Sequence, residues 1–449
     1  MIDDQNRVLH DEPQTQALSF RPGERQVIWV LWLTYGAFYF CRTNLSTAVP
    51  GLTDNVEAGG LGFSAKQVGW ILGSLKLTYG IGQLCNGFLA EHFSARRLLA
   101  LGMLVSAGLN VLFGLSTGFY FLLFVWACNG YFQSLGWTPC MRVVANWIPV
   151  QRRGKSIGII GTGYQVTQGL TYVVAGGAVE LFGWRGALYV PAALLVAAAV
   201  VMLLFLRDAP TERKVSDATG DVLIHRATPA RHSFVENVVI TLSNPSLWFL
   251  GASLGLLNAC RYGYIDWGLT HLKETQAIAV GTAALKYAVL PIGAVMGSFV
   301  CGWATDRFFG SRRAPVICIL LVVLCFLGIF YDGIVRTSAA GTLMMLLAIG
   351  FCIYGPQVLL VGTAPTDLAR RGTSAAAAGF VNFMGYMGAF SGDVVTGHCL
   401  EVYGWQTTLY VWSAWALAAA IAAGLLWNAT AKKIEVDEVQ IGPRHETTG

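Results

Sequence analysis

The sequence predicts an all-α membrane protein built from two six-helix halves. Hydrophobic residues make up 55% of its 449 residues and charged residues only 12%, against about 25% charged in an ordinary soluble domain. Apolar runs of roughly 20 residues, each long enough to cross a hydrocarbon core of about 30 Å as a helix, recur along nearly the whole chain. Helices are expected because backbone groups in lipid must bond within their own segment. Motifs in the first half also return in the second.

Twelve membrane-spanning helices are expected, six before and six after a polar, turn-rich segment. The predicted spans are 26–50, 66–90, 97–117, 119–146, 155–179, 186–207, 246–271, 279–304, 314–334, 340–363, 373–400 and 405–428. The predicted organisation is a tail (1–25), an N-terminal half (26–207), a linker (208–245), a C-terminal half (246–428) and a second tail (429–449). The polar N-terminus lacks the pattern of a cleaved signal, so the first span itself is expected to direct insertion.

Two pairs of motifs indicate that the halves are repeats. GFLAEHFSARR (87–97) follows the second span and GWATDRFFGSRR (302–313) follows the eighth. QRRGKS…FGWRGALYV (151–190) is answered by ARRGTS…YGWQTTLYV (369–411). Parallel repeats with a site at their interface are typical of transporters. We expect the clusters Glu91/Arg96 and Asp306/Arg312 to act as gates that latch one side of the molecule.

The distribution of basic residues predicts that both termini are cytoplasmic. The loops on the side of the termini carry ten basic residues: Arg96, Arg97, Arg152, Arg153, Lys155, Arg307, Arg312, Arg313, Arg370 and Arg371. The opposite loops carry four: Lys66, Arg185, Lys273 and Arg336. Positive charge is retained on the cytoplasmic side. The predicted location is therefore the plasma membrane, in a bacterium the inner membrane, with multiple passes.

Arg42 and Arg261 stand at matching depths in the first and seventh predicted spans. They lie roughly 22 to 24 Å from the cytoplasmic ends, at a rise of 1.5 Å per residue. One interpretation is that each snorkels to the outer interface or is neutralised by an acid such as Asp266. Their symmetry favours function, since placing each arginine in lipid costs roughly 2.5 to 3.5 kcal/mol. A guanidinium presents a planar fork that matches phosphate oxygens.

Polar and aromatic side chains near the two arginines predict an aqueous cavity. The candidate binding residues besides the arginines are Tyr35, Tyr39, Lys76, Gln133, Trp137, Tyr164, Asn258, Tyr262, Tyr354, Asn382, Tyr386 and Asp393. For a single Tyr or Gln the alternative is a hydrogen bond between helices, worth about 0.6 kcal/mol. Lys76 has two interpretations, a third cationic ligand or a wall lysine paired with Asp393.

Several segments resemble the organophosphate:phosphate antiporters of the major facilitator superfamily. They are YGAFYFCRTNLSTAVPGL, LTYGIGQLCNGFLAE, FQSLGWTPC, NACRYGYIDWGLTHLKE and IYGPQVLL. The resemblance covers nearly the whole chain outside the linker and tails. It implies that Arg42 and Arg261 bind the phosphoryl group. It also implies that Tyr35, Tyr39, Tyr354, Tyr386 and Gln133 lie near them.

The chain also departs from that family's pattern. It has Gln83 where relatives such as the glycerol phosphate transporter have a lysine, and Tyr164 where they have a histidine. Lys76 lies seven residues before Gln83 on the same helical face, which suggests a displaced charge. Thr43 follows Arg42 where relatives often have a lysine, so Asp266 is expected to lack its usual partner.

The resemblance and the residues together predict a secondary transporter that exchanges a small organophosphate for inorganic phosphate by alternating access. The alternatives are a proton-coupled symporter of organic anions or phosphonates, in which Asp266 or Asp393 titrates, and a membrane sensor of sugar phosphate. The expected partners are the organophosphate, inorganic phosphate and membrane lipid. We expect a monomer, and no cofactor, metal, nucleic acid or enzymatic activity.

Overall fold

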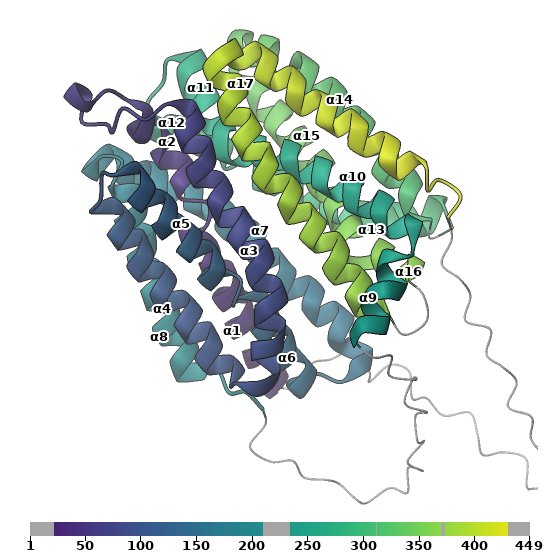
Figure 1. Ribbon diagram of the computed structural model, residues 1–449. Coiled ribbons are helices and arrows are strands. Elements are labelled where there is room, and N and C mark those ends of the chain that lie inside the picture. Colours follow the sequence, from purple (N-terminus) through teal and green to yellow (C-terminus); the bar gives the residue numbers. More distant parts are fainter. Residues whose placement is uncertain (1–21, 210–233, 311, 370–372, 430–449) are drawn as a thin grey trace, which may run out of the picture.

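The computed structural model describes residues 22–209, 234–310, 312–369 and 373–429, and these residues form helices and connecting turns. Most of the predicted tails and of the predicted linker lie outside these ranges, while residues 22–25 of the first tail begin a helix and residues 234–242 of the linker form another. Figure 1 shows the helices of the N-terminal half, purple to blue, beside those of the C-terminal half, teal to yellow. In the part of the chain that the structure describes, the architecture is all-helical, as the composition predicts.

The N-terminal half begins with a broken first span. Its elements are α1 (Pro22–Ala37), η2 (Phe38–Cys41), α2 (Leu45–Thr53), η3 (Val56–Ala58), α3 (Ala65–His92), α4 (Ala95–Gly114), α5 (Phe119–Gln133), α6 (Trp137–Trp147), α7 (Val150–Phe182) and α8 (Gly186–Phe205). Within this half α1 packs on α7, α3 on α5, and α4 on both α5 and α8. We call the end where α1 begins and α8 ends the Pro22 end, and the opposite one the Thr53 end.

The C-terminal half follows a similar plan. Its elements are α9 (Phe234–Leu242), α10 (Pro245–Tyr262), η4 (Gly263–Trp267), α11 (Gly268–Gln276), α12 (Val280–Tyr287), α13 (Leu290–Phe308), α14 (Arg313–Thr337), α15 (Ala339–Val358), η5 (Leu359–Thr363), α16 (Ala364–Leu368) and α17 (Ser374–Gly424). The long α17 holds the last two predicted spans, which meet at Gly404, where φ is 76°. Only glycine adopts that backbone region readily.

Helices occupy all twelve predicted segments, but several of them are not continuous. The first span leaves the α-helix between Phe38 and Asn44, where side-chain hydroxyls bond the chain's own carbonyls. Thr43 Oγ1 donates to Tyr39 O at 3.1 Å and Ser46 Oγ to Thr43 O at 2.6 Å. Such local bonds compete with the regular helix ladder. The predicted fourth span is likewise divided between α5 and α6.

The number of membrane crossings stays a prediction. Within the described ranges, six helices are long and apolar enough to cross a membrane, or seven if the bent pair Glu236–Leu242 and Pro245–Gln276 counts as one span. The broken first span and the tyrosines, glutamines and glycines within α7 explain why apolarity and length alone do not pick out every predicted crossing. The chain is a multi-pass membrane protein on these apolar helices.

The two halves meet most closely toward the Thr53 end. There α3 packs on α17, α7 on α12, and α2 on α11. Glu401 Oε2 accepts from the backbone N–H of Lys66 at 2.9 Å, and Glu180 Oε1 accepts from that of Gly281 at 3.0 Å. A Cβ added at Gly69 would lie 2.6 Å from the carbonyl oxygen of Asp393, so only glycine permits this approach of α3 to α17. These contacts seal the interface between the halves at this end.

Candidate functional site

Arg42 lies at the break in the first span and is held from within its own half. Its Nε donates to Gln133 Oε1 at 3.2 Å and its Nη2 to Gln133 O at 3.3 Å. The rings of Tyr39 and Tyr79 lie 4.7 and 4.3 Å from the guanidinium carbon. A guanidinium above an aromatic face is attracted by the ring's quadrupole. Arg42 is therefore bonded and screened on several sides before any ligand arrives.

A buried network of polar side chains fixes Gln133. Its Nε2 donates to Ser106 Oγ at 2.7 Å, and Ser106 Oγ in turn donates to Asn129 Oδ1. Asn129 Nδ2 donates to the carbonyl oxygen of Cys41 at 2.9 Å, next to Arg42. The network thus closes a ring from the broken backbone through α4 and α5 to the guanidinium. A fully bonded network in a low-dielectric interior specifies one arrangement.

Arg261 lies on α10 and keeps more of its bonding capacity free. Its Nη2 donates to Tyr354 Oη at 3.3 Å, while its buried Nε has no hydrogen-bond partner. The rings of Tyr262 and Tyr354 lie 4.7 and 4.8 Å from its guanidinium carbon. Tyr354 Oη donates to Gln168 Oε1 of α7 at 2.6 Å, which links the two halves beside the arginine. A buried donor without a partner costs free energy, so this arginine is suited to accept an anion.

A cavity of about 420 Å³ lies between the halves. Twenty residues line it: Tyr35, Tyr39, Tyr79, Gln83, Trp137, Ile157, Gly158, Gly161, Thr162, Tyr164, Gln165, Arg261, Ser298, Phe299, Gln357, Val358, Val361, Gly362, Asn382 and Tyr386. Arg261 is the charged member of this lining. Ile157 and Gly158 come from the start of α7, so the cavity extends toward the Pro22 end, away from the sealed interface.

A row of aromatic rings connects the two arginines across the cavity. Tyr39, against Arg42, stacks on Tyr164 with ring centroids 5.1 Å apart. Tyr164 lies 6.4 Å from Tyr354, whose ring faces Arg261. Arg42 itself is absent from the lining and lies behind Tyr39 and Tyr79. In this conformation the cavity reaches one arginine directly and the other through its tyrosines.

Six of the twelve predicted binding residues other than the two arginines line the same cavity: Tyr35, Tyr39, Trp137, Tyr164, Asn382 and Tyr386. Tyr35 packs on Trp137 at 4.8 Å, and Tyr386 packs on Tyr79 at 4.6 Å. Asn382 also lines the cavity, whereas Asn258 is buried and donates to Gly385 O at 3.0 Å. The cavity therefore combines phenol and indole walls with neutral amides and the edge of one buried arginine, Arg261.

Lys76 is buried and does not line this cavity. Its Nζ lies 2.5 Å from Asp266 Oδ2 and 2.7 Å from Asp393 Oδ2. The pairing with Asp393 is one of the two sequence interpretations. Thr43 supplies no charge to Asp266, and Asp266 is instead paired with Lys76 of α3, a partner that the sequence did not suggest. Gln83 lines the cavity and Lys76 does not, so the interpretation that Lys76 supplies the displaced charge to a ligand stays a prediction.

The predicted gate residues form bonds within their own halves. The backbone N–H of Arg96 donates to Asp208 Oδ1 at 2.8 Å, and its guanidinium bonds Leu203 O. The Glu91 side chain lies outside the described residues. Asp306 pairs with Arg313 at 3.0 Å, one residue beyond its predicted partner, while Arg312 Nε donates to Phe309 O.

Tyr79 is the main site residue absent from the sequence prediction. Its ring contacts the guanidinium of Arg42 and the ring of Tyr386, and it lines the cavity. The signal was present, since Tyr79 stands between Lys76 and Gln83 at helical spacing on one face of α3. Ser298 and Phe299 of α13, also missed, carry no such pattern because they lie in an apolar run.

The fold and the site together define a class of protein. Two repeated helical halves surround a central cavity with a cationic edge, and ligand sites at such interfaces are characteristic of secondary transporters. The chain matches the Major Facilitator Superfamily over residues 31–393 and belongs to that family.

Proteins with similar sequences carry the following names. A probable hexose phosphate transport protein of Chlamydia trachomatis is 28% identical, covering 94% of this chain and 95% of its own length. The glycerol-3-phosphate transporter of Bacillus subtilis is 28% identical, covering 91% and 93%. The membrane sensor protein UhpC of Escherichia coli is 26% identical, covering 91% and 92%.

Solved structures support the fold. An inward-facing, occupied bacterial homologue of the human lysosomal transporter Spinster superposes with a TM-score of 0.73 at 17% identity, covering 92% of this chain and 98% of that one. The nucleoside transporter NupG gives a TM-score of 0.67 at 16% identity, covering 90% and 99%. At such identities the likeness establishes the architecture alone.

Proposed function

We propose that the protein is a secondary transporter that exchanges a small organophosphate for inorganic phosphate by alternating access. The observation that carries the proposal is the pair of buried arginines, one from each half, joined by a row of tyrosines at a central cavity. Relatives named for hexose phosphate, glycerol-3-phosphate and phosphoglycerate transport support the same class of ligand. Transport rather than enzymatic chemistry follows from membership of this superfamily.

The chemistry of the two arginines suits a phosphoryl group. Guanidinium groups give charge-assisted, paired hydrogen bonds to phosphate oxygens. A ligand that enters from the Pro22 end reaches Arg261 first, whose Nε has no other partner. If the bound ligand also contacts Arg42, that side chain must move past Tyr39 toward the cavity. The ligand then bridges the two arginines and draws the halves together. The unliganded pair of like charges opposes that closure, so the loaded transporter changes state more readily than the empty one.

The organic part of the ligand would rest against the aromatic and amide walls. Tyr35, Trp137 and Tyr386 offer ring faces, and Gln357 has a buried Oε1 with no hydrogen-bond partner. Gln165 donates to Ser298 at 2.8 Å, so both halves contribute polar groups. Hydroxyl groups of the ligand would satisfy such atoms.

We further propose that the Pro22 end faces the cytoplasm of a bacterium and that the protein acts as a monomer in the inner membrane. The excess of arginine and lysine in loops on the side of the termini supports this orientation. The cavity then opens inward, while the contacts at the Thr53 end close the outer side. Both walls of the cavity come from one chain, so no second copy is needed to complete it.

Counterflow in proteoliposomes tests the exchange. Vesicles loaded with phosphate should take up labelled phosphate, and the competition should be strongest with the true organophosphate among glycerol phosphate, hexose phosphates, phosphoglycerates and phosphonates. The variant Arg42→Lys/Arg261→Lys keeps both charges but loses both forks, and it should lose uptake. Wild-type uptake by that double variant would contradict the assignment.

A second function has a specific observation in its favour, the 26% identity to a membrane sensor protein over 91% of the chain. In that case phosphate esters bind but do not exchange. Binding measured by thermal shift without counterflow in the same preparation would support a sensor. Uptake driven by a pH gradient into vesicles without internal phosphate would instead support proton-coupled symport through Asp266 or Asp393.

A further inference from the structure

Four aromatic rings of the N-terminal half meet at one wall of the central cavity. Tyr35, Tyr39, Trp137 and Tyr164 all belong to its lining. The ring centroid of Tyr35 lies 4.8 Å from that of Trp137. The ring plane of Tyr35 stands at 76° to that of Tyr39 and at 77° to that of Tyr164. The rings therefore meet at an angle rather than in one parallel stack, and we call these four residues the aromatic corner.

The aromatic corner offers partners for a cation. A ring face attracts an ammonium group, and enclosures of aromatic rings bind quaternary ammonium groups in many proteins. Tyr39 already faces the guanidinium of Arg42, at 4.7 Å. Within the described part of the chain, no arginine or lysine lies over the rings of Tyr35, Trp137 or Tyr164. A cation in this part of the cavity must therefore come from the ligand.

The anion-binding group lies one ring further along the cavity. Tyr164 of the aromatic corner lies 6.4 Å from Tyr354, and the ring of Tyr354 lies 4.8 Å from the guanidinium carbon of Arg261. Arg261 is the charged member of the lining. A phosphoryl group at Arg261 and a cation at the aromatic corner are thus separated by about one step between neighbouring rings. A short alkyl chain spans such a step.

Several polar groups of the lining already have partners within the protein. Thr162 Oγ1 accepts from Trp32 Nε1 at 3.0 Å and donates to Ile159 O at 2.7 Å. Ser298 Oγ accepts from Gln165 Nε2 at 2.8 Å. A ligand hydroxyl that is buried without a partner costs free energy. The lining therefore suits a ligand with few hydroxyl groups better than it suits a sugar with many.

We propose that the organic part of the ligand carries an ammonium group, which the aromatic corner binds while Arg261 binds the phosphoryl group. The substrate class is then the aminoalkyl phosphates and phosphonates, such as phosphoethanolamine, phosphocholine and aminoethylphosphonate. This inference deepens the proposed function and rests on its binding of a phosphoryl group at Arg261.

Two pairs of compounds that differ in the ammonium charge test the proposal on the full-length protein in detergent. Propylphosphonate has a methyl group in place of the amine of aminoethylphosphonate, and dimethylbutyl phosphate has carbon in place of the nitrogen of phosphocholine. Thermal shift gives the dissociation constants. We expect the charged compound of one pair or both to bind about tenfold more tightly than its neutral partner. The pair with the larger ratio distinguishes a primary from a quaternary ammonium group.

Equal or tighter binding of the neutral compound in both pairs would overturn the proposal. Binding of none of the four compounds would overturn it as well. These measurements need no substitution, so they decide the proposal even where a variant does not fold.

Variants of the aromatic corner test where the ammonium group binds. Trp137→Leu and Tyr35→Leu each remove a ring but keep an apolar side chain, and each should bring the ratio of the two dissociation constants toward one. Tyr35→Phe keeps the ring and should keep the ratio. Phe299→Leu is the matched control, because Phe299 lines the cavity from α13, outside the aromatic corner. An unchanged ratio in both leucine variants of the corner, or an equal fall in Phe299→Leu, would overturn the assignment.

Phosphate counterflow separates this inference from the proposed function. Phosphate exchange by a protein that shows no preference for the ammonium compounds would support the exchanger and contradict the inference. A preference for the ammonium compounds without phosphate exchange would contradict the exchanger and support the inference, with the protein then binding the same class of ligand as a sensor.

Discussion

The two halves place equivalent arginines in different surroundings. Arg42 makes two hydrogen bonds to Gln133, which is itself fixed by Ser106. Arg261 makes one bond to Tyr354 and has a buried Nε without a partner. The N-terminal arginine is thus built into its half, whereas the C-terminal one is presented to the cavity. Under the proposed function, Arg42 is a fixed part of the site and Arg261 makes the first contact with the ligand.

The largest expected effect comes from exchanging each arginine for lysine separately. Arg261→Lys should lower the rate of phosphate counterflow about 100-fold, since charged hydrogen bonds are worth about 1.5–3 kcal/mol each and this fork has few other partners. Arg42→Lys should lower it about tenfold, because two of its donors already bond Gln133. Initial rates in proteoliposomes with matched protein content make the measurement. Equal losses of counterflow rate in the two variants would contradict the proposal that Arg261 contacts the ligand more directly than Arg42.

Gln133 supports Arg42, and Gln168 supports Tyr354 beside Arg261. Replacing Gln133 should destabilise the protein more than replacing Gln168. Gln133→Leu leaves Arg42 without two acceptors and should destabilise the protein by about 1–3 kcal/mol. Gln168→Leu leaves only Tyr354 Oη without its acceptor and should cost about 1 kcal/mol. Melting temperatures of the two variants in detergent, measured without ligand, show which of them is destabilised more. A larger loss in Gln168→Leu would contradict the view that Arg42 is the more firmly held arginine.

The smallest expected effect is on phosphate affinity and comes from Tyr354, which contacts Arg261 in the C-terminal half. Tyr354→Phe removes the hydroxyl between Arg261 and Gln168 but keeps the ring. One hydrogen bond of about 0.5–1.5 kcal/mol is lost, so we expect a change of about three- to tenfold in the half-saturating phosphate concentration. Tyr164→Phe, whose ring stacks on Tyr39, is the matched control for loss of a phenol in the same row. An identical shift in both would show that Tyr354 does not orient the arginine.

Much of the architecture follows from the sequence because apolar runs and repeated motifs are local signals. The spans, the repeat and the inward position of Arg42 and Arg261 required only spacing and the cost of charge in lipid. The break at Phe38–Cys41 could not be predicted in the same way. It depends on bonds such as Asn129 to Cys41 O, which join residues 88 positions apart.

The site shows the same limit. Lys76 could be recognised as a buried charge, yet its pairing with Asp266 and Asp393 arises from helices that are distant in sequence. The sequence left two interpretations of Lys76, a ligand or a paired wall residue. Helical spacing shows which residues share one face of a helix, but it does not show which other helix packs against that face. The missed Tyr79 lay on a recognised face, so a search along that face from Lys76 would have found it.

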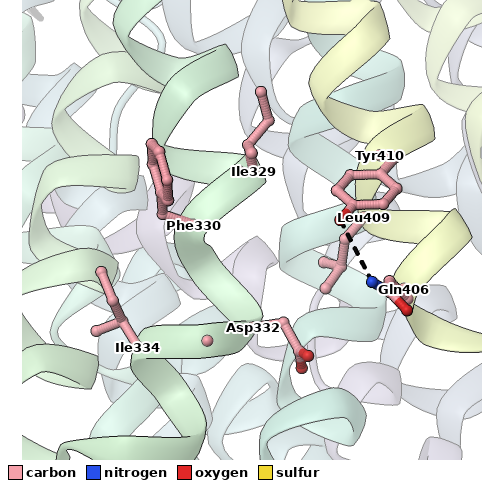
Figure 2. Close-up of a pocket in the computed structure, with 9 residues that line it drawn as sticks. Ile329, Phe330, Asp332, Ile334, Gln406, Leu409 and Tyr410 are labelled. Carbon is pink, nitrogen blue, oxygen red and sulfur yellow. Dashed lines mark hydrogen bonds between the residues drawn. The ribbon is translucent and has the colours of Figure 1, made fainter.

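Figure 2 shows a second hollow, of about 400 Å³, whose lining comes from α14 and the last part of α17. Phe330 and Tyr410 border it and are 61% and 49% exposed, and Gln406 donates to Tyr410 Oη at 3.3 Å. It lies within one half and lacks a cationic side chain among its lining residues. The contrast with the central cavity shows that volume alone does not identify the transport site.

The dependence of Arg42 on Gln133 has a consequence for biogenesis. The first span is synthesised well before α5, so a nascent chain that ends before residue 119 contains the charge but not its two acceptors. A lone arginine in the middle of a span raises the insertion free energy by about 2.5–3.5 kcal/mol. The first span therefore carries a charge without these acceptors until α5 has been synthesised, and we expect the span to become more stable in the membrane once Gln133 is in place.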